Sequence, residues 1–286
     1  MNQSAMPPVD VMDLFPEVRE GGVRILQSLS EQEWRLPTAC AGWSVHDVAL
    51  HIGGGLLANV SRRRDQHVGN FREFEPPNNA TLDEHERLIH TLNGWNEMWV
   101  LAGRRISPAL LIEIIDSAGC QLEEYFRRLD FRVLGDPVGW AGLQPAPVWL
   151  DVAREYTELW THLAQIREAT GRAVVDAPHL LAPVLATFAH GIPHALRSID
   201  RPMGATLTVV VHGEAGGQWW VKRAASGWEL HGEVTGSADA VIDLDQVTAW
   251  RLATKGMSRD DARREVNIKG DIELGEGFLN LVAILA

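Results

Sequence analysis

The sequence predicts an α plus α+β protein: an antiparallel helix bundle over residues 1–202, followed by a small α+β domain over residues 203–286. Two observations predict this division. Apolar residues recur with helical spacing through the first two thirds of the chain, with no competing strand pattern. Short β-branched and aromatic segments, separated by glycine and serine, begin near Pro202 and are typical of strands and hairpins.

Local start and stop signals define the helices of the first part. Apolar residues predict a first helix over about Asp10–Ser28. Ser44 followed by Asp47 has the spacing of a capping box, which predicts the start of the second helix. A third helix is expected over residues 88–102, and a fourth begins where Ser107 and Pro108 form an N-cap followed by a first-turn proline. A last long helix is expected over about Val148–Thr170.

The second part reads as four strands followed by two helices. The strand segments are ATLTVVVHG, GQWWVKRA, GWELHG and ADAVIDLD. DQVTAWRLATKGM then reads as a helix, NIKGD as a short strand or turn, and IELGEGFLNLVAIL as a final amphipathic helix. This order predicts a small mixed domain.

Composition narrows the functional class. Lys and Arg number 26 and Asp and Glu 38, so the net charge of −12 argues against nucleic acid or an anionic membrane surface as a partner. The longest apolar stretches are too short to span a bilayer, and no secretory signal pattern opens the sequence. Cys40 and Cys120 form neither a CxxC pair nor a disulfide framework. We therefore expect a cytoplasmic protein.

Glu158 and His162 are the first candidates for a metal site. Residues four apart lie one turn apart on the same helix face, so both side chains can reach one ion. They lie on the flank of the apolar stripe of their helix. A solvated charge pair on the bundle surface explains the same spacing, and the spacing alone does not decide between the two.

His51 lies at the edge of the apolar stripe of its own helix, in line with Gly55 and Ala58. Small residues beside a histidine leave room for a close neighbour or a bound molecule. Gly53, Gly54 and Gly55 follow it, and each costs about 1 kcal/mol relative to alanine inside a helix. Either local contacts compensate for this cost or the helix is interrupted there.

These motifs resemble those of a known family. EWRLPTACAGWSVHDVALHIGG is similar to the signature of the DinB-like, mycothiol-dependent maleylpyruvate isomerase N-terminal domain, whose pattern leads into a helix with a metal-binding histidine. That histidine maps onto His51, and the second metal motif of the family maps onto Glu158 and His162. The segment from Ala238 to the end resembles a sterol-carrier-protein-2-like domain.

The resemblance implies a four-helix bundle that holds one divalent metal, usually zinc, through His51, Glu158 and His162. It also implies mycothiol as a thiol cosubstrate and a small, unsaturated acid as substrate, with cis–trans isomerisation or thiol transfer as the reaction. By their position on the helix faces, Arg62 or Arg154 is expected to pair with the substrate carboxylate. The run Arg62–Arg64 is usually typical of a solvated face, and binding of an acidic substrate is the alternative.

Two other classes of function stay open from the sequence. A metal held by the same residues activates water in many hydrolases, with no thiol involved. A non-catalytic protein would instead hold an apolar ligand in its C-terminal domain, where Phe278, Leu279, Leu281 and Val282 make the last helix apolar. Packing of that helix onto its own sheet explains the same residues.

Overall fold

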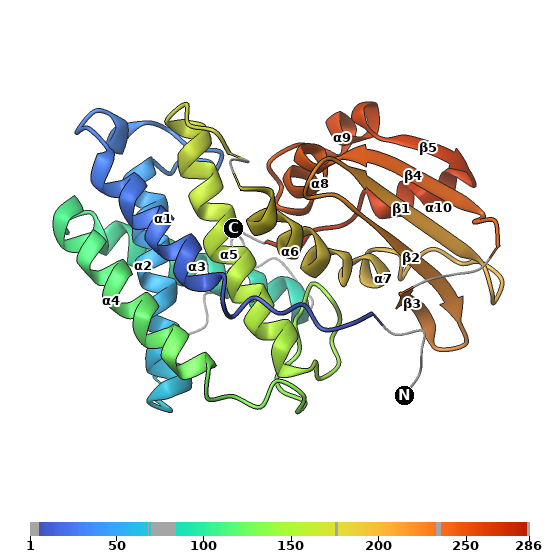
Figure 1. Ribbon diagram of the computed structural model, residues 1–286, viewed down its shortest axis with the longest axis horizontal. Coiled ribbons are helices and arrows are strands. Elements are labelled where there is room, and N and C mark those ends of the chain that lie inside the picture. Colours follow the sequence, from blue (N-terminus) through green and yellow to red (C-terminus); the bar gives the residue numbers. More distant parts are fainter. Residues whose placement is uncertain (1–5, 68, 70–83, 175–176, 233–235, 285–286) are drawn as a thin grey trace. The chain divides into compact units, whose positions relative to one another are not determined.

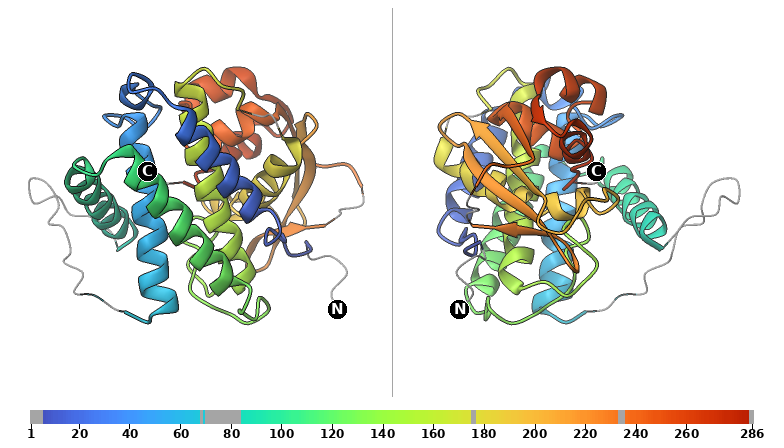
Figure 2. Two further views of the ribbon diagram at one scale, coloured as in Figure 1. Left: turned by 60° about the vertical axis from the view of Figure 1, so that its left-hand side comes forward. Right: turned by 90° about the vertical axis from the view of Figure 1, so that its right-hand side faces the viewer.

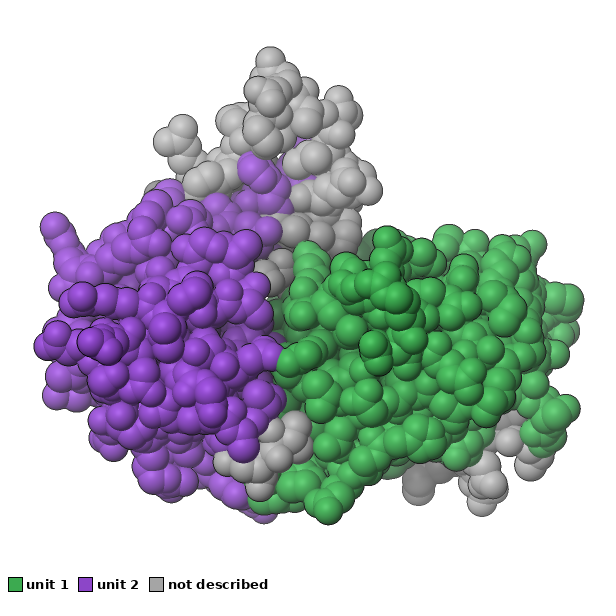
Figure 3. Space-filling view, turned by 90° about the horizontal axis from the view of Figure 1, so that it is seen from above, with its two compact units in different colours: residues 1–11, 130–160, 175–285 green, residues 12–129, 161–174, 286 purple. Residues whose placement is uncertain are grey.

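The computed structural model describes residues 6–67, 69, 84–174, 177–232 and 236–284. The chain forms two compact units, drawn in different colours in Figure 3. Unit 1 comprises residues 1–11, 130–160 and 175–285, and unit 2 comprises residues 12–129, 161–174 and 286. The division passes through α5 (Val148–Ala169), which is one continuous helix. None of the described helices has the length and apolar character needed to cross a membrane.

Unit 2 is helical, as the sequence predicts (Figure 1). It contains α1 (Phe15–Ser28), α2 (Val45–Asn59), α3 (Glu84–Gly103), α4 (Pro108–Phe126) and the last part of α5. Helix α4 contacts α1 and α2, and α3 contacts α2. Figure 2 shows α1, α2 and α4 side by side in blue, light blue and green.

Helix α1 begins at Phe15 rather than near Asp10, where the sequence analysis placed its start. Pro16 lies in the first turn of the observed helix. A helix that began five residues earlier would carry this proline in its interior, where the ring clashes with the preceding turn and removes a hydrogen bond. The proline therefore fixes the start of the helix more strongly than the apolar pattern does.

The start of α2 is fixed by the predicted capping box. The Asp47 backbone N–H donates to Ser44 Oγ at 3.3 Å, and the Ser44 backbone N–H donates to Asp47 Oδ2 at 3.0 Å. Arg104 donates to Asp47 Oδ1 at 2.9 Å. Burial raises the pKa of Asp47, but the Arg104 and Ser44 hydrogen bonds lower it more, so the carboxylate stays ionised.

The three glycines do not interrupt α2, and neighbouring helices use the space that Gly53 and Gly54 leave. A Cβ on Gly54 would lie 2.3 Å from Trp99 Nε1, and a Cβ on Gly53 would lie 3.1 Å from Leu111 Cδ1. Trp99 Nε1 donates to the Leu50 carbonyl at 2.8 Å. Gly53 and Gly54 therefore let α4 and α3 approach α2 closely, which compensates for their low helix propensity, whereas a Cβ on Gly55 would have no neighbour within 4 Å.

A buried ion pair joins α1 to α4. Arg19 is 8% exposed, and its Nε donates to Glu123 Oε1 at 2.7 Å. Its guanidinium also pairs with Asp116. A Cβ on Gly119 would lie 2.5 Å from Arg19 Cδ, so the glycine makes room for the arginine side chain. Removing one partner of such a pair would leave an uncompensated buried charge. The intact pair therefore fixes how α1 lies on α4.

Unit 1 contains a five-stranded sheet in the order β3-β2-β1-β4-β5 (Figure 1). The strands are β1 (Thr206–His212), β2 (Gly217–Ala224), β3 (Gly227–His231), β4 (Ala240–Asp245) and β5 (Asn267–Gly270). The pair β1–β4 is parallel, and the other pairs are antiparallel. The sequence predicted four of these strands and left the fifth as a strand or turn.

One face of this sheet is continuously buried. Leu207, Val209 and Val211 alternate along β1, and the register pairs them with Ala240, Ile242 and Leu244 of β4. Helices α6 (Pro178–Ala189), α7 (Ile192–Ala195), α8 (Gln246–Ala253) and α10 (Ile272–Phe278) contact the strands. Helix α6 contacts α8 and β2 although it precedes residue 202. The domain boundary at that residue stays a prediction.

The end of the chain differs from the expected amphipathic helix. Helix α10 ends at Phe278, and the chain then continues without helical structure to Ile284. The backbone N–H groups of Ala283 and Ile284 donate to the Ala253 carbonyl at 2.7 and 3.3 Å. These two N–H groups supply hydrogen bonds to a carbonyl at the end of α8, which has no partner within its own helix. In a longer α10 the same N–H groups would bond inside that helix instead. A short helix, α9 (Arg259–Glu265), was not predicted separately and contacts α8.

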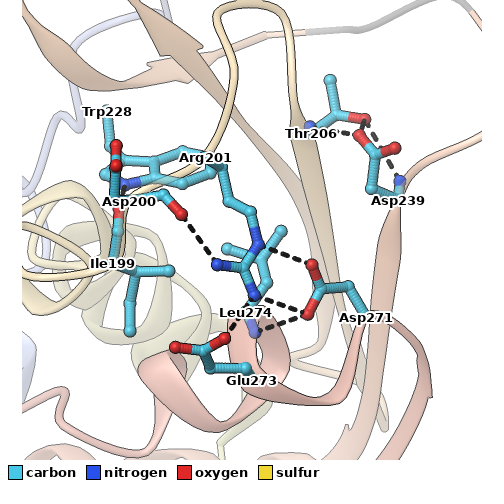
Figure 4. A network of polar contacts seen from close by, with 9 residues as sticks. All are labelled: Ile199, Asp200, Arg201, Thr206, Trp228, Asp239, Asp271, Glu273 and Leu274. Atoms are coloured by element: carbon cyan, nitrogen blue, oxygen red, sulfur yellow. Dashed lines mark hydrogen bonds and ion pairs between the residues drawn. The ribbon is translucent and has the colours of Figure 1, made fainter.

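An ion-pair network fixes the start of α10 (Figure 4). Arg201 donates from Nε and Nη2 to the two Asp271 oxygens at 2.6 and 2.9 Å, and from Nη2 to Glu273 at 2.8 Å. Asp271 is also the N-cap of α10, because its Oδ1 accepts from the Leu274 backbone N–H at 3.0 Å. The Arg201 hydrogen bonds lower the pKa of Asp271 to about 2.

We predict that Asp271→Asn destabilises the protein at neutral pH but not in acid. The folded-state pKa lies below the unfolded value of about 3.9, so the ionised carboxylate stabilises the fold above that pH. This contribution disappears as the pH falls through about 2, the folded-state pKa. Thermal unfolding should show a loss of about 1–2 kcal/mol at pH 6, shrinking towards pH 2.5.

Glu273→Gln is the control, because this carboxylate is 73% exposed and bonds the same arginine. It should change the unfolding free energy by less than about 0.5 kcal/mol at either pH. An Asp271→Asn penalty that is equal at pH 6 and pH 2.5 would contradict the electrostatic origin of the effect.

Candidate metal centre

Two helices bring together the three residues expected to bind metal. His51 is on α2, and Glu158 and His162 are on α5. The imidazole rings of His51 and His162 lie with centroids 4.6 Å apart and planes at 83°. One ligand atom from each of the three residues lies within 4.8 Å of the other two. The structure therefore groups His51, Glu158 and His162 as the sequence analysis expected.

Helix geometry places Glu158 and His162 together. Residues four apart on α5 lie one turn apart on the same face, and the helix is continuous through both. His162 is only 2% exposed, whereas His51 and Glu158 are half-buried. A solvated surface pair, the other interpretation of this spacing, does not match a histidine with this burial.

The donor chemistry of the three residues fits a divalent transition metal. Two imidazole nitrogens and one carboxylate are a common three-ligand set for catalytic zinc, which leaves a further coordination position for water or substrate. Imidazole suits zinc, copper, iron and nickel, so the donor types alone do not select one of these metals.

Trp43 lies against His51 and is itself held in place. The Trp43 and His51 rings have centroids 5.2 Å apart, and Trp43 Nε1 donates to Glu97 Oε2 at 2.8 Å. Thr38 fixes the preceding turn, since its backbone N–H and its Oγ1 both bond the Trp43 carbonyl, at 3.0 and 2.9 Å. The loop before α2 thereby restricts the orientation of the His51 ring from one side.

Gln165 was not singled out in the sequence and lies directly beside His162. Its Oε1 is 2.8 Å from His162 Nδ1 and 3.3 Å from Cys40 Sγ. Gln165 and Cys40 are both buried. The only sequence signal was its place three residues after His162, which puts the two side chains on neighbouring positions of the helix surface.

Arg154 lies one turn before Glu158 and is engaged by carboxylates. It donates to Asp151 Oδ1 at 2.9 Å and to Glu155 Oε1 at 2.5 Å. Burial lowers the pKa of Arg154, but the charges of Glu155, Asp151 and Glu158 raise it more. The guanidinium therefore stays protonated, and its positive charge offsets part of the negative charge of three carboxylates of α5.

Arg62 is exposed and lies in η2 (Val60–Arg64), a π-helical turn that continues α2. It follows His51 by about three helical turns, or about 16 Å of helix length at 1.5 Å per residue. The expected pairing of Arg62 or Arg154 with a substrate carboxylate stays a prediction.

Comparison with known proteins finds a family model that matches the helical part of the chain and solved structures that share the fold. Residues 15–167, more than half of the chain, match the family model described as the mycothiol maleylpyruvate isomerase N-terminal domain. This range contains all three residues of the candidate centre. A search of curated proteins found no match to the sequence.

Two solved structures share the fold over nearly the whole chain. The crystal structure of the mycothiol-dependent maleylpyruvate isomerase has a TM-score of 0.53 and 13% identity, with 92% of this chain and 93% of that chain covered. A histidine-to-alanine mutant of that enzyme gives 0.51 and 14% over the same shares.

A structure named as the ubiquinone synthesis protein UbiJ-SCP2 covers 32% of this chain and 89% of that chain, at 19% identity and a TM-score of 0.24. This score is too low to assign the fold of the C-terminal region. The two full-length matches show the shared fold, and the family model covers the residues that build the centre. The chain belongs to the mycothiol maleylpyruvate isomerase N-terminal domain family.

Proposed function

We propose that this protein is a metal-dependent enzyme that uses a low-molecular-weight thiol, mycothiol, as cosubstrate for the isomerisation of a small unsaturated acid or for thiol transfer to it. The observation that carries the proposal is the grouping of His51, Glu158 and His162 within 4.8 Å. The family match and the fold shared with a mycothiol-dependent isomerase support it.

His51, Glu158 and His162 would hold the metal, with zinc as the expected ion. Zinc bound by two imidazoles and a carboxylate supplies an open position at which a thiol is stabilised as its thiolate. His162 is buried, whereas His51 and Glu158 are half-buried, so the group of three side chains is partly accessible to solvent. Arg154 keeps a positive charge one turn from Glu158.

A thiol is a suitable catalyst for isomerising an electron-poor double bond. Addition of the sulfur converts the double bond to a single bond, rotation follows, and elimination restores the double bond and the free thiol. No oxidant or reductant is consumed, and the thiol is regenerated. If the addition product is released instead, the reaction is a transfer. An external thiol also agrees with the buried, hydrogen-bonded state of Cys40.

Arg62 and Arg154 are our candidates for binding the substrate carboxylate. Arg62 is exposed in η2, whereas the guanidinium of Arg154 is shared with Asp151 and Glu155. A planar guanidinium binds a carboxylate through two parallel hydrogen bonds, which would orient the acid. We further propose a cytoplasmic location, a sterol-carrier-like C-terminal domain, and no nucleic-acid or membrane partner, consistent with the net charge of −12.

The proposal predicts about one equivalent of zinc in untagged protein and its loss in His162→Ala. Removing one of three ligands leaves two donors, which bind zinc much more weakly. Elemental analysis after gel filtration measures the stoichiometry directly. His212→Ala is the matched control, because this histidine is 62% exposed and pairs with Asp243 on the sheet. It should retain the full equivalent.

Wild-type protein without metal under these conditions, or equal zinc content in wild type and His162→Ala, would contradict the metal site. Metal-free wild-type protein that carries a co-purified lipid would instead favour the non-catalytic interpretation of the C-terminal domain.

Turnover should depend on added thiol. With maleylpyruvate as the first substrate, zinc-loaded enzyme should isomerise it in the presence of mycothiol and show no measurable rate without it. Absorbance of the substrate and chromatography of the products distinguish isomerisation from transfer. Hydrolysis products at the same rate with and without thiol would overturn the thiol-dependent function and favour the hydrolase.

Arg62→Ala and Arg154→Ala test the substrate role of the two arginines. Loss of the residue that binds the carboxylate should raise the KM about tenfold, which corresponds to about 1.4 kcal/mol of binding free energy. Zinc content, measured in the same samples, should remain at one equivalent for that variant. An unchanged KM in both variants would exclude both residues from carboxylate binding.

A further inference from the structure

The hydrogen bonds around His162 define which of its ring nitrogens carries the proton. His162 Nδ1 is 2.8 Å from Gln165 Oε1, a carbonyl-type oxygen that can only accept. Nδ1 must therefore donate, and in a neutral imidazole the lone pair then lies on Nε2. A histidine presents a lone pair to a metal, so this tautomer directs Nε2 towards the ion.

The orientation of the Gln165 amide is supported from a second side. Cys40 Sγ lies 3.3 Å from the same Oε1 and, as a thiol, donates to it. If the amide were reversed, its NH₂ group would face both atoms, and His162 Nδ1 would have to accept. The proton of the neutral ring would then lie on Nε2, which would prevent metal binding through that nitrogen. The Cys40 thiol therefore favours the oxygen in this position, and an Nδ1–H tautomer of His162 agrees with it.

Burial makes this arrangement rigid. Relative exposure is 2% for His162, 3% for Gln165 and 9% for Cys40. Water cannot readily replace the amide oxygen at such a site, and an imidazole N–H left without an acceptor there carries a desolvation cost. Gln165 is on α5 with His162, while Cys40 comes from the loop before α2, the helix that carries His51. The amide oxygen thus joins the two segments that supply the histidines.

We infer that Gln165 is the positioning residue of the metal centre: its amide oxygen fixes the Nδ1–H tautomer and the ring orientation of His162, so that Nε2 is the metal ligand. The inference rests on the proposed function, because it assigns a role relative to the bound ion. Cys40 has a secondary part in it, since a thiol is a weak donor and the amide keeps its bond to His162 without it.

Zinc affinity tests the inference, measured by competition with a chromophoric chelator at fixed pH. Gln165→Leu removes the acceptor and should weaken zinc binding about 10–100-fold, the usual effect of losing a hydrogen-bond partner of a ligand. Gln165→Glu restores an acceptor of the same length and should bind zinc within about threefold of the wild type, or more tightly. A purely structural role would not be rescued by the buried carboxylate.

Cys40→Ala is the matched control, because it disturbs the same buried cluster but leaves the bond between His162 and Gln165. It should stay within about threefold of the wild-type zinc affinity. Equal losses in Cys40→Ala and Gln165→Leu, or a Gln165→Leu affinity equal to the wild type, would overturn the inference.

A measurement on metal-free protein separates this inference from the proposed function. Nitrogen NMR of the His162 ring should show a protonated Nδ1 and an unprotonated Nε2 in the wild type, and a mixture of tautomers in Gln165→Leu. A wild-type ring protonated on Nε2 overturns the role of Gln165 even if zinc binds. The expected tautomer in a protein that binds no zinc would contradict the metal site while supporting the hydrogen bond.

Discussion

His51 and His162 come from distant parts of the sequence, and their rings meet because α2 and α5 pass close to each other within the helical unit. Every chemical statement about this protein depends on that approach. The fit is close elsewhere on α5 as well: a Cβ on Gly22 of α1 would lie 2.6 Å from Leu163 Cδ1, next to His162. Close-packed neighbours of this kind leave the ligand side chains little freedom to move apart.

The same helical unit fixes the rotation of α2 at its first turn. Ser44 and Asp47 set where the helix begins, and Arg104, the first residue of the loop between α3 and α4, pairs with Asp47. His51 is one turn beyond Asp47 on the same face of α2, so the contacts that hold the first turn also restrain rotation of the helix at the imidazole. A capping interaction of ordinary strength therefore has a direct effect on the geometry of the metal centre.

Much of the candidate centre was predictable because its signals are local. The spacing of Glu158 and His162, the edge position of His51 and the capping box are all readable within one or two turns of helix. The resemblance of the Trp43 region to a known family then joined the two stretches.

The role of Gln165 was not predictable, because a glutamine in a helix has no distinctive pattern and its contact with His162 depends on side-chain orientations that the spacing does not give. For the same reason the glycines after His51 were ambiguous until Trp99 and Leu111 were placed against them. In the sheet unit, the early end of α10 depends on a hydrogen bond to Ala253, a contact between segments far apart in the chain.

That contact at Ala253 also bears on how the protein can be handled. The non-helical segment after α10 bonds the carbonyl at the end of α8 through Ala283 and Ile284, so a fusion partner attached after this segment would adjoin residues that hold part of the fold. A bulky reporter attached there would strain the helix whose other end follows directly from β4, an interior strand of the sheet.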